Sequence, residues 1–264
     1  MRPRSLLLLL LLLLVPAAPR LVHAAQPPDL AGIAYEQRPG SQLPGNATFQ
    51  DDTGRTVRLA NLFKGKPLIL ALGYFHCPNL CSVVRASLLG ALSRSELVAG
   101  RDYSLIVLSI DPLETSGQAA AAKTGEMQRY PLPGAELNWH FLTGAADKVK
   151  AVSDAVGFHA RFDSERKMFM HPAGVVFTTP AGLVSSYLLG VGYEPSDVRL
   201  ALAHAKLGTI APKASPVLLL CFDYDATTGR YTLAIMKLLR LAAVLTVAAL
   251  AGAICLARFR ERRA

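Results

Sequence analysis

Two stretches in the middle of the chain, residues 67–74 and 103–110, are apolar at almost every position. Their length is typical of strands that are buried on both faces of a sheet. Stretches with helical spacing of apolar residues follow them. The whole pattern predicts strands at 48–50, 56–59, 67–74, 103–110, 139–142, 174–178 and 184–189, and helices at 81–97, 118–130, 148–156 and 195–207. Strands that alternate with helices before a final hairpin and helix predict an α/β sandwich with a mixed central sheet.

The two ends of the chain are apolar in a different way. Residues 1–25 begin with Arg2 and Arg4, continue with an unbroken apolar run and end in small residues, which predicts a secretory signal peptide. Residues 237–257 have the length and hydropathy of a transmembrane helix, and the arginine-rich tail at 258–264 is expected on the cytoplasmic side. We therefore expect an exported domain that is anchored in the membrane by a C-terminal helix.

The rest of the chain divides into three parts. Residues 26–45 are rich in Pro, Gly and Gln and indicate a tether, and residues 46–210 contain the predicted α/β domain. Residues 211–236 include two strand-like runs around the polar segment 225–229, which predicts a hairpin close to the membrane.

Composition narrows the class of protein. With 52% hydrophobic and 18% charged residues, the chain is not disordered. The net charge is +9, but six of these nine units lie in residues 1–25 and 258–264. The body therefore lacks the basic surface that nucleic-acid binding requires, and we expect no nucleic-acid partner.

The four cysteines differ in their surroundings. Cys255 lies within the predicted span and Cys221 within an apolar run, so both are expected to pack as small apolar residues. Cys77 and Cys81 lie in the sequence GYFHCPNLCS, where a buried strand passes through a short turn into a helix. The positive end of a helix favours thiolate over thiol, which suits either a redox pair or a soft-metal site. A purely structural disulfide is disfavoured because so short a loop restrains little chain entropy.

A third ligand would come from a histidine. His171 precedes the apolar strand at 174–178, and in a thioredoxin-like sheet that strand lies beside the one ending at Tyr74. Two thiolates and one imidazole suit Cu(I) and tolerate Cu(II); zinc is conceivable but would normally take a fourth ligand. His76 is expected to be part of the turn and of the wall of the site, and packing or solvent-exposed roles are expected for His140, His159 and His204. Asp111, at the end of a strand, could orient a ligand or cap the next helix.

These motifs resemble the Sco/SenC family of membrane-anchored, thioredoxin-like copper proteins. The matching segments are GYFHCPNLC at 73–81, SIDP at 109–112, WHFLTG at 139–144, the His171 loop and the final hairpin with its helix. Together they cover about residues 45–210. The sequence CFDYDATTGRY at 221–231 resembles a bacterial subgroup with a C-terminal anchor; we assign no metal role to Asp223.

The resemblance implies a copper site made by Cys77, Cys81 and His171 in a periplasmic domain held at the inner membrane. It implies delivery of copper to the copper-bearing subunit of cytochrome c oxidase, with a periplasmic protein as the copper donor. Met170 and Pro172 stand where the family commonly has Asp and Ser. Pro172 restricts His171 to extended geometry.

An enzymatic role is the alternative. In a thiol–disulfide oxidoreductase, Cys77 would attack a client disulfide and Cys81 would resolve the mixed disulfide. The spacing of these cysteines is one residue longer than the C-x-x-C of such enzymes, which argues mildly against this role. A peroxidase would need an activated thiolate beside an Arg or Thr arrangement that the sequence does not display.

Overall fold

A computed structural model describes residues 32–63, 65–76, 80–213, 242–247, 250–252 and 254, with the backbone alone at Leu80 and Cys81. Its elements in chain order are β1 (Ala34–Tyr35), β2 (Thr48–Gln50), β3 (Thr56–Arg58), α2 (Ala60–Phe63), β4 (Leu68–Gly73), α3 (Leu80–Ser93), β5 (Ser104–Ser109), α4 (Ser116–Arg129), α5 (Ala135–Asn138), β6 (Trp139–Leu142), α6 (Ala146–Ala155), β7 (Phe158–His159), β8 (Arg161–Asp163), β9 (Met168–Met170), β10 (Gly174–Thr178), β11 (Val184–Leu189) and α7 (Pro195–Lys206).

The central sheet has the strand order β11-β10-β4-β5-β6. Strands β4, β5 and β6 run parallel, whereas β10 is antiparallel to both β4 and β11. The parallel strands are joined through α3 and α4, and β10 and β11 form the final hairpin. This arrangement confirms the α/β sandwich with a mixed central sheet, including the predicted position of β10 beside β4.

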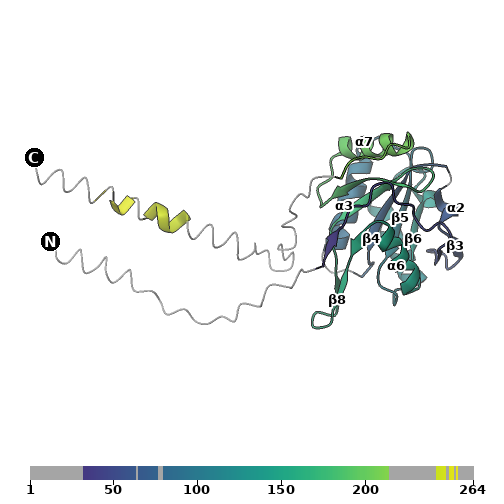
Figure 1. The fold of residues 1–264 in the computed structure, drawn as a ribbon, viewed down its shortest axis with the longest axis horizontal. Coiled ribbons are helices and arrows are strands. Elements are labelled where there is room, and N and C mark those ends of the chain that lie inside the picture. Colours follow the sequence, from purple (N-terminus) through teal and green to yellow (C-terminus); the bar gives the residue numbers. More distant parts are fainter. Residues whose placement is uncertain are drawn as a thin grey trace, which may run out of the picture. The chain divides into compact units, whose positions relative to one another are not determined.

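The side chains of the central strands pack alternately on the two faces of the sheet, as the pleat requires. On β4, Ile69 and Ala71 pack in one core with residues of α3 and α7, and Leu70 and Leu72 pack in a second core with residues of α6. Figure 1 shows α7 and α6 on opposite sides of the sheet. Since both faces are covered, every residue of β4 and β5 is buried, which explains the apolar runs.

Several short elements were not predicted. Strand β1 pairs with β7, and β8 pairs with β9 in a hairpin that projects from the body of the domain (Figure 1). Part of the segment expected to be a tether packs on the domain, because Ala34–Tyr35 forms β1 and Leu43 is only 1% exposed. The short helices α2 and α5 were also missed; they have four residues each, too few to produce a helical period.

Many expectations about the two ends fall outside the described residues. These are the signal peptide at 1–25, most of the hairpin at 211–236, the tail at 258–264, and Cys221, Asp223 and Cys255. Of the expected span at 237–257, residues 242–247, 250–252 and 254 are described, all of them helical. Within the described parts of the chain, no helix combines the length and hydropathy that crossing a membrane would need.

The predicted hairpin of β2 and β3 is confirmed, and Asp51 organises its turn. Asp51 Oδ1 accepts hydrogen bonds from the Thr53 amide at 2.9 Å and hydroxyl at 2.6 Å, and from the Arg55 amide at 3.0 Å. Burial opposes ionisation, but these bonds and the Arg55 guanidinium together lower the pKa of Asp51. The ionised carboxylate is therefore the form that stabilises the turn.

Replacing Asp51 with alanine is expected to lower the free energy of unfolding by about 1–3 kcal/mol at pH 7, because the turn loses charge-assisted hydrogen bonds. A carboxylate with a lowered pKa stabilises the fold above its unfolded-state value, and this contribution disappears as the pH falls through the folded-state value. Urea unfolding of the wild type and the variant should therefore give curves that converge below about pH 4. A difference that stays constant with pH would contradict this role.

Candidate metal centre

One buried carboxylate holds the backbone of the turn that follows β4. Glu114 Oε2 accepts a hydrogen bond from the Phe75 amide and Oε1 accepts one from the His76 amide, both at 2.8 Å. The hydroxyl of Ser109, the last residue of β5, donates to Oε2 at 2.6 Å. An ionised carboxylate only accepts hydrogen bonds, so three donors match it. The turn just before Cys77 is thereby fixed to the end of β5.

A buried ion pair contacts the same turn from the helices. Arg85 Nε lies 3.1 Å from Glu126 Oε1, and these side chains are 9% and 7% exposed. Arg85 Nη1 also donates to the Tyr74 carbonyl oxygen at 3.5 Å. Arg85 belongs to α3, one helical turn after Cys81, and Glu126 belongs to α4. The pair therefore connects two helices to the backbone three positions before Cys77.

His171 is buried between β9 and β10. The centroid of its ring lies 6.0 Å from that of Tyr74 and 5.8 Å from that of Phe158. Its Nδ1 lies 3.0 Å from the Pro172 carbonyl oxygen, and the tautomer that donates this hydrogen bond has its lone pair on Nε2. A backbone carbonyl that fixes the tautomer in this way is typical of histidines that bind metals. The ring is thus suited to ligation through Nε2.

The sheet brings His171 beside the turn that leads to Cys77. Because β10 is antiparallel to β4, the segment that precedes β10 lies at the same edge of the sheet as the residues that follow β4. Tyr74, the first residue after β4, contacts the His171 ring there. Cys77 lies outside the described residues, and Cys81 is described only by its backbone, in the first turn of α3.

The three-ligand set stays a prediction. Among the residues that the structure describes, no three His, Cys, Asp or Glu side chains form a group that could hold a metal ion. The thiols of Cys77 and Cys81, which would complete the set with His171, are not among the described side chains. The structure therefore shows where the imidazole and the turn lie, whereas the role of the two cysteines as ligands is predicted from the sequence.

The other histidines occupy separate places. His76 is exposed, and its Nδ1 lies 3.4 Å from Glu114 Oε1. His159 on β7 lies 3.3 Å from the Glu36 carboxylate, His140 lies on β6, and His204 lies near the end of α7. Of the five, His171 is the buried one that contacts the ring of Tyr74.

The alternative of a helix cap at Asp111 is wrong. Thr115 caps α4 in a capping box with Gln118. Asp111 Oδ1 instead accepts a hydrogen bond from the Leu113 amide at 2.9 Å, which closes the short turn between β5 and α4. This turn places the Glu114 carboxylate within hydrogen-bond distance of the backbone amides of residues 75 and 76.

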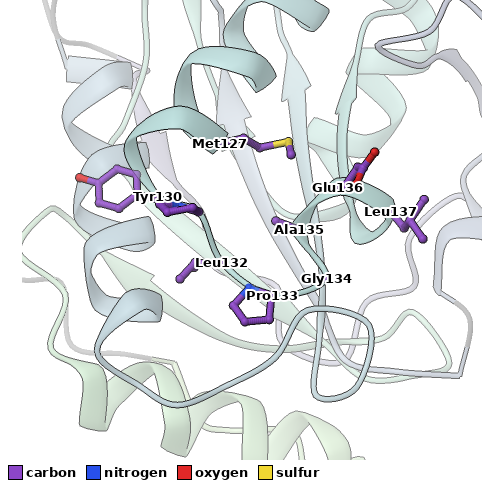
Figure 2. A pocket seen from close by; sticks show the side chains of 9 residues that line it. Met127, Tyr130, Leu132, Pro133, Gly134, Ala135, Glu136 and Leu137 are labelled. Atoms are coloured by element: carbon purple, nitrogen blue, oxygen red, sulfur yellow. The ribbon is translucent and has the colours of Figure 1, made fainter.

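Two surface hollows lie apart from His171. One, of about 390 Å³, lies between the end of α4 and α5; its apolar lining includes Met127, Leu132 and Pro133 (Figure 2). The other, of about 350 Å³, is more polar and includes Thr48, Thr143 and Glu114. Neither hollow is lined by His171, so we do not place the metal centre in either of them.

Sequence reasoning did not identify Glu114, Arg85 or Glu126. A signal existed for Arg85, a charged residue that shares the helix face of the buried Leu88, Leu89 and Leu92. A charge at such a position needs a buried partner. No comparable signal pointed to Glu114, because its partners are backbone amides 38 and 39 positions away in the sequence.

Comparisons with known proteins cover most of the α/β domain. The SCO1/SenC family model matches residues 36–203. A provisionally assigned electron transfer protein of Aquifex aeolicus VF5 is 27% identical, with a TM-score of 0.56, over 63% of this chain and 94% of its own. A second A. aeolicus VF5 structure, an electron transport protein by provisional assignment, is 28% identical over 63% of this chain and 98% of its own, with a TM-score of 0.52.

A plant structure shares the fold. Arabidopsis thaliana ScoI, solved with copper bound, is 18% identical over 62% of this chain and 97% of its own, with a TM-score of 0.51. No curated protein sequence gives a significant match.

Proposed function

The chain belongs to the SCO1/SenC family, and on this premise we propose that it binds copper and acts in the assembly of cytochrome c oxidase. Its ligands are the thiolates of Cys77 and Cys81 and Nε2 of His171. The observation that carries this proposal is the buried His171 ring, which is packed against Tyr74 and hydrogen-bonded at Nδ1 to Pro172. The copper bound to the related ScoI of A. thaliana supports the choice of metal.

The chemistry of these ligands suits copper as a cargo. Thiolates are soft ligands that select Cu(I), and an imidazole is also a ligand for Cu(II). All three must be deprotonated to bind, so copper affinity falls as the pH falls. Copper held by three ligands at a turn next to a helix end can pass to a partner by ligand exchange.

The ends of the chain provide the proposed location. The hydropathy of residues 1–25 and 237–257 supports export to the periplasmic side and anchoring in the inner membrane by a C-terminal helix. An anchored domain stays close to a membrane-bound client. The client would be the copper-bearing subunit of cytochrome c oxidase, and a periplasmic protein would be the copper donor.

Copper loading of the reduced protein tests the proposal. Anaerobic addition of Cu(I), followed by removal of unbound metal, is expected to leave one copper per chain, and X-ray absorption is expected to show two sulfur ligands and one nitrogen ligand. The double variant Cys77→Ser, Cys81→Ser is the matched control and should retain none. If the wild type retains no copper but catalytically reduces a disulfide substrate, the oxidoreductase function replaces the one proposed here.

A further inference from the structure

Glu114 is a buried acid that neither the ligand set nor the ion pair of Arg85 uses. Its side chain is 4% exposed, and both of its oxygens face the backbone of the turn after β4. A buried carboxylate is costly unless charge-assisted hydrogen bonds compensate for its lost hydration. Here the compensation comes from the amides of Phe75 and His76, the two residues directly before Cys77, and from Ser109.

The segment that carries Glu114 is itself held by hydrogen bonds. The Ser109 hydroxyl accepts a hydrogen bond from the Asp111 amide at 3.1 Å, and the Glu114 amide donates to the Asp111 carbonyl oxygen at 3.1 Å. Thr115 then begins α4 with its capping box. The Gln118 side chain from that box reaches His76, with Nε2 3.3 Å from Nδ1. The turn after β4 is thus bound on one side to a loop that has its own hydrogen bonds and leads directly into α4.

We propose that Glu114 is a positioning residue for the copper site: its carboxylate fixes the peptide groups at Phe75 and His76, and so the direction in which the chain proceeds to Cys77. This inference rests on the proposed function. Groups that orient metal ligands through hydrogen bonds are worth about 10–100-fold in metal affinity. Glu114 acts here on the backbone that carries the ligand, at the point where β4 ends, and does not itself ligate the metal.

The variant Glu114→Gln tests this role with little change in shape. An amide has one acceptor oxygen and one donor nitrogen, so it can accept from only one of the two backbone amides. Copper affinity, measured by competition with a chromophoric Cu(I) chelator, should fall by about 10–100-fold. Amide hydrogen exchange at Phe75 or at His76 in the copper-free protein should become at least about tenfold faster, because one of these two donors loses its acceptor.

The matched control is Glu136→Gln, an exposed glutamate on α5, which should change neither quantity. Glu114→Asp keeps both oxygens on a shorter side chain; it should give a smaller loss and replaces Glu114→Gln if that variant does not fold. A role in stability alone would lower the unfolding midpoint of Glu114→Gln but leave its copper affinity unchanged, and that result overturns the inference. Unchanged exchange at Phe75 and His76 also overturns it.

The two proposals fail in different ways. If the wild type binds no copper, the proposed function is wrong, while hydrogen exchange still decides whether Glu114 holds the turn. If the wild type binds copper and Glu114→Gln binds it equally well, the proposed function stands and the positioning role is wrong.

Discussion

Replacing His171 with alanine is expected to lower the affinity for copper by at least about 100-fold, because the variant loses a ligand, and loss of an outer-shell partner alone costs about 10–100-fold. The two remaining thiolates should still bind Cu(I), but more weakly and without the nitrogen ligand. Cu(II) should be affected more strongly than Cu(I), because imidazole is the harder ligand of the set. Competition with a chromophoric chelator measures the affinity, and X-ray absorption measures the loss of nitrogen.

The alanine variant also removes a ring that packs against Tyr74 and Phe158. His171→Phe separates the two effects, since it keeps an aromatic ring at this position but has no ring nitrogen. Both variants should lose affinity to a similar extent, whereas His171→Phe should unfold closer to the wild type. His159→Ala, which removes an imidazole that lies near Glu36, is the control and should bind copper normally. Unchanged copper affinity in both His171 variants would remove His171 from the site.

The sequence was sufficient for the parts of the fold that are defined by apolar patterns. Strands β6, β10 and β11 have the predicted bounds, and β4 and β5 differ from the prediction by one residue at each end. These strands are buried on both faces or lie in a hairpin with a clear turn, so their signals are strong. Because the sequence predicts β10 beside β4, it also predicts that His171 lies near the end of β4, where its ring contacts Tyr74.

The elements that were missed are short and partly exposed. Strands β8 and β9 have three residues each and join through a tip without glycine, so neither periodicity nor turn chemistry marks them. They nevertheless matter for the site, because Phe169 of β9 packs edge to face on Tyr74, beside His171. Such contacts depend on tertiary packing, which the local pattern does not encode.

Prediction was weakest for the charged groups that support the turn. The contacts of Glu114 with the backbone, and of Arg85 with Glu126, join positions about 40 residues apart in the sequence. Arg85 could have been noticed from its position on the helix face of buried leucines, but nothing in the sequence identified its partner Glu126 or the role of Glu114. Only the packing of α3 and α4 against the sheet brings Glu114 and the Arg85–Glu126 pair into contact with the turn that leads to Cys77.

The ion pair of Arg85 with Glu126 gives the largest expected effect on stability. Replacing Arg85 with alanine is expected to lower the free energy of unfolding by about 3–5 kcal/mol, because the Glu126 carboxylate stays buried without its partner. Among the described residues, Glu126 Oε2 already has no hydrogen-bond partner, so the variant would leave both oxygens unpaired. The Tyr74 carbonyl oxygen would also lose the donor at 3.5 Å. Urea unfolding of the copper-free protein measures the change.

Two matched variants test this explanation. Lys150→Ala removes an exposed ion pair with Asp154, whose atoms lie 2.6 Å apart, and should cost less than about 1 kcal/mol. The double variant Arg85→Met, Glu126→Leu replaces the buried charges with apolar side chains of similar volume and should recover most of the lost stability, since such replacements are often neutral or stabilising. If Arg85→Ala lowers the free energy of unfolding no more than Lys150→Ala does, the buried ion pair contributes no more to stability than an exposed one. If the double variant is as unstable as Arg85→Ala, the lost stability comes from the contact of Arg85 with Tyr74 and not from a Glu126 carboxylate that is buried without a partner.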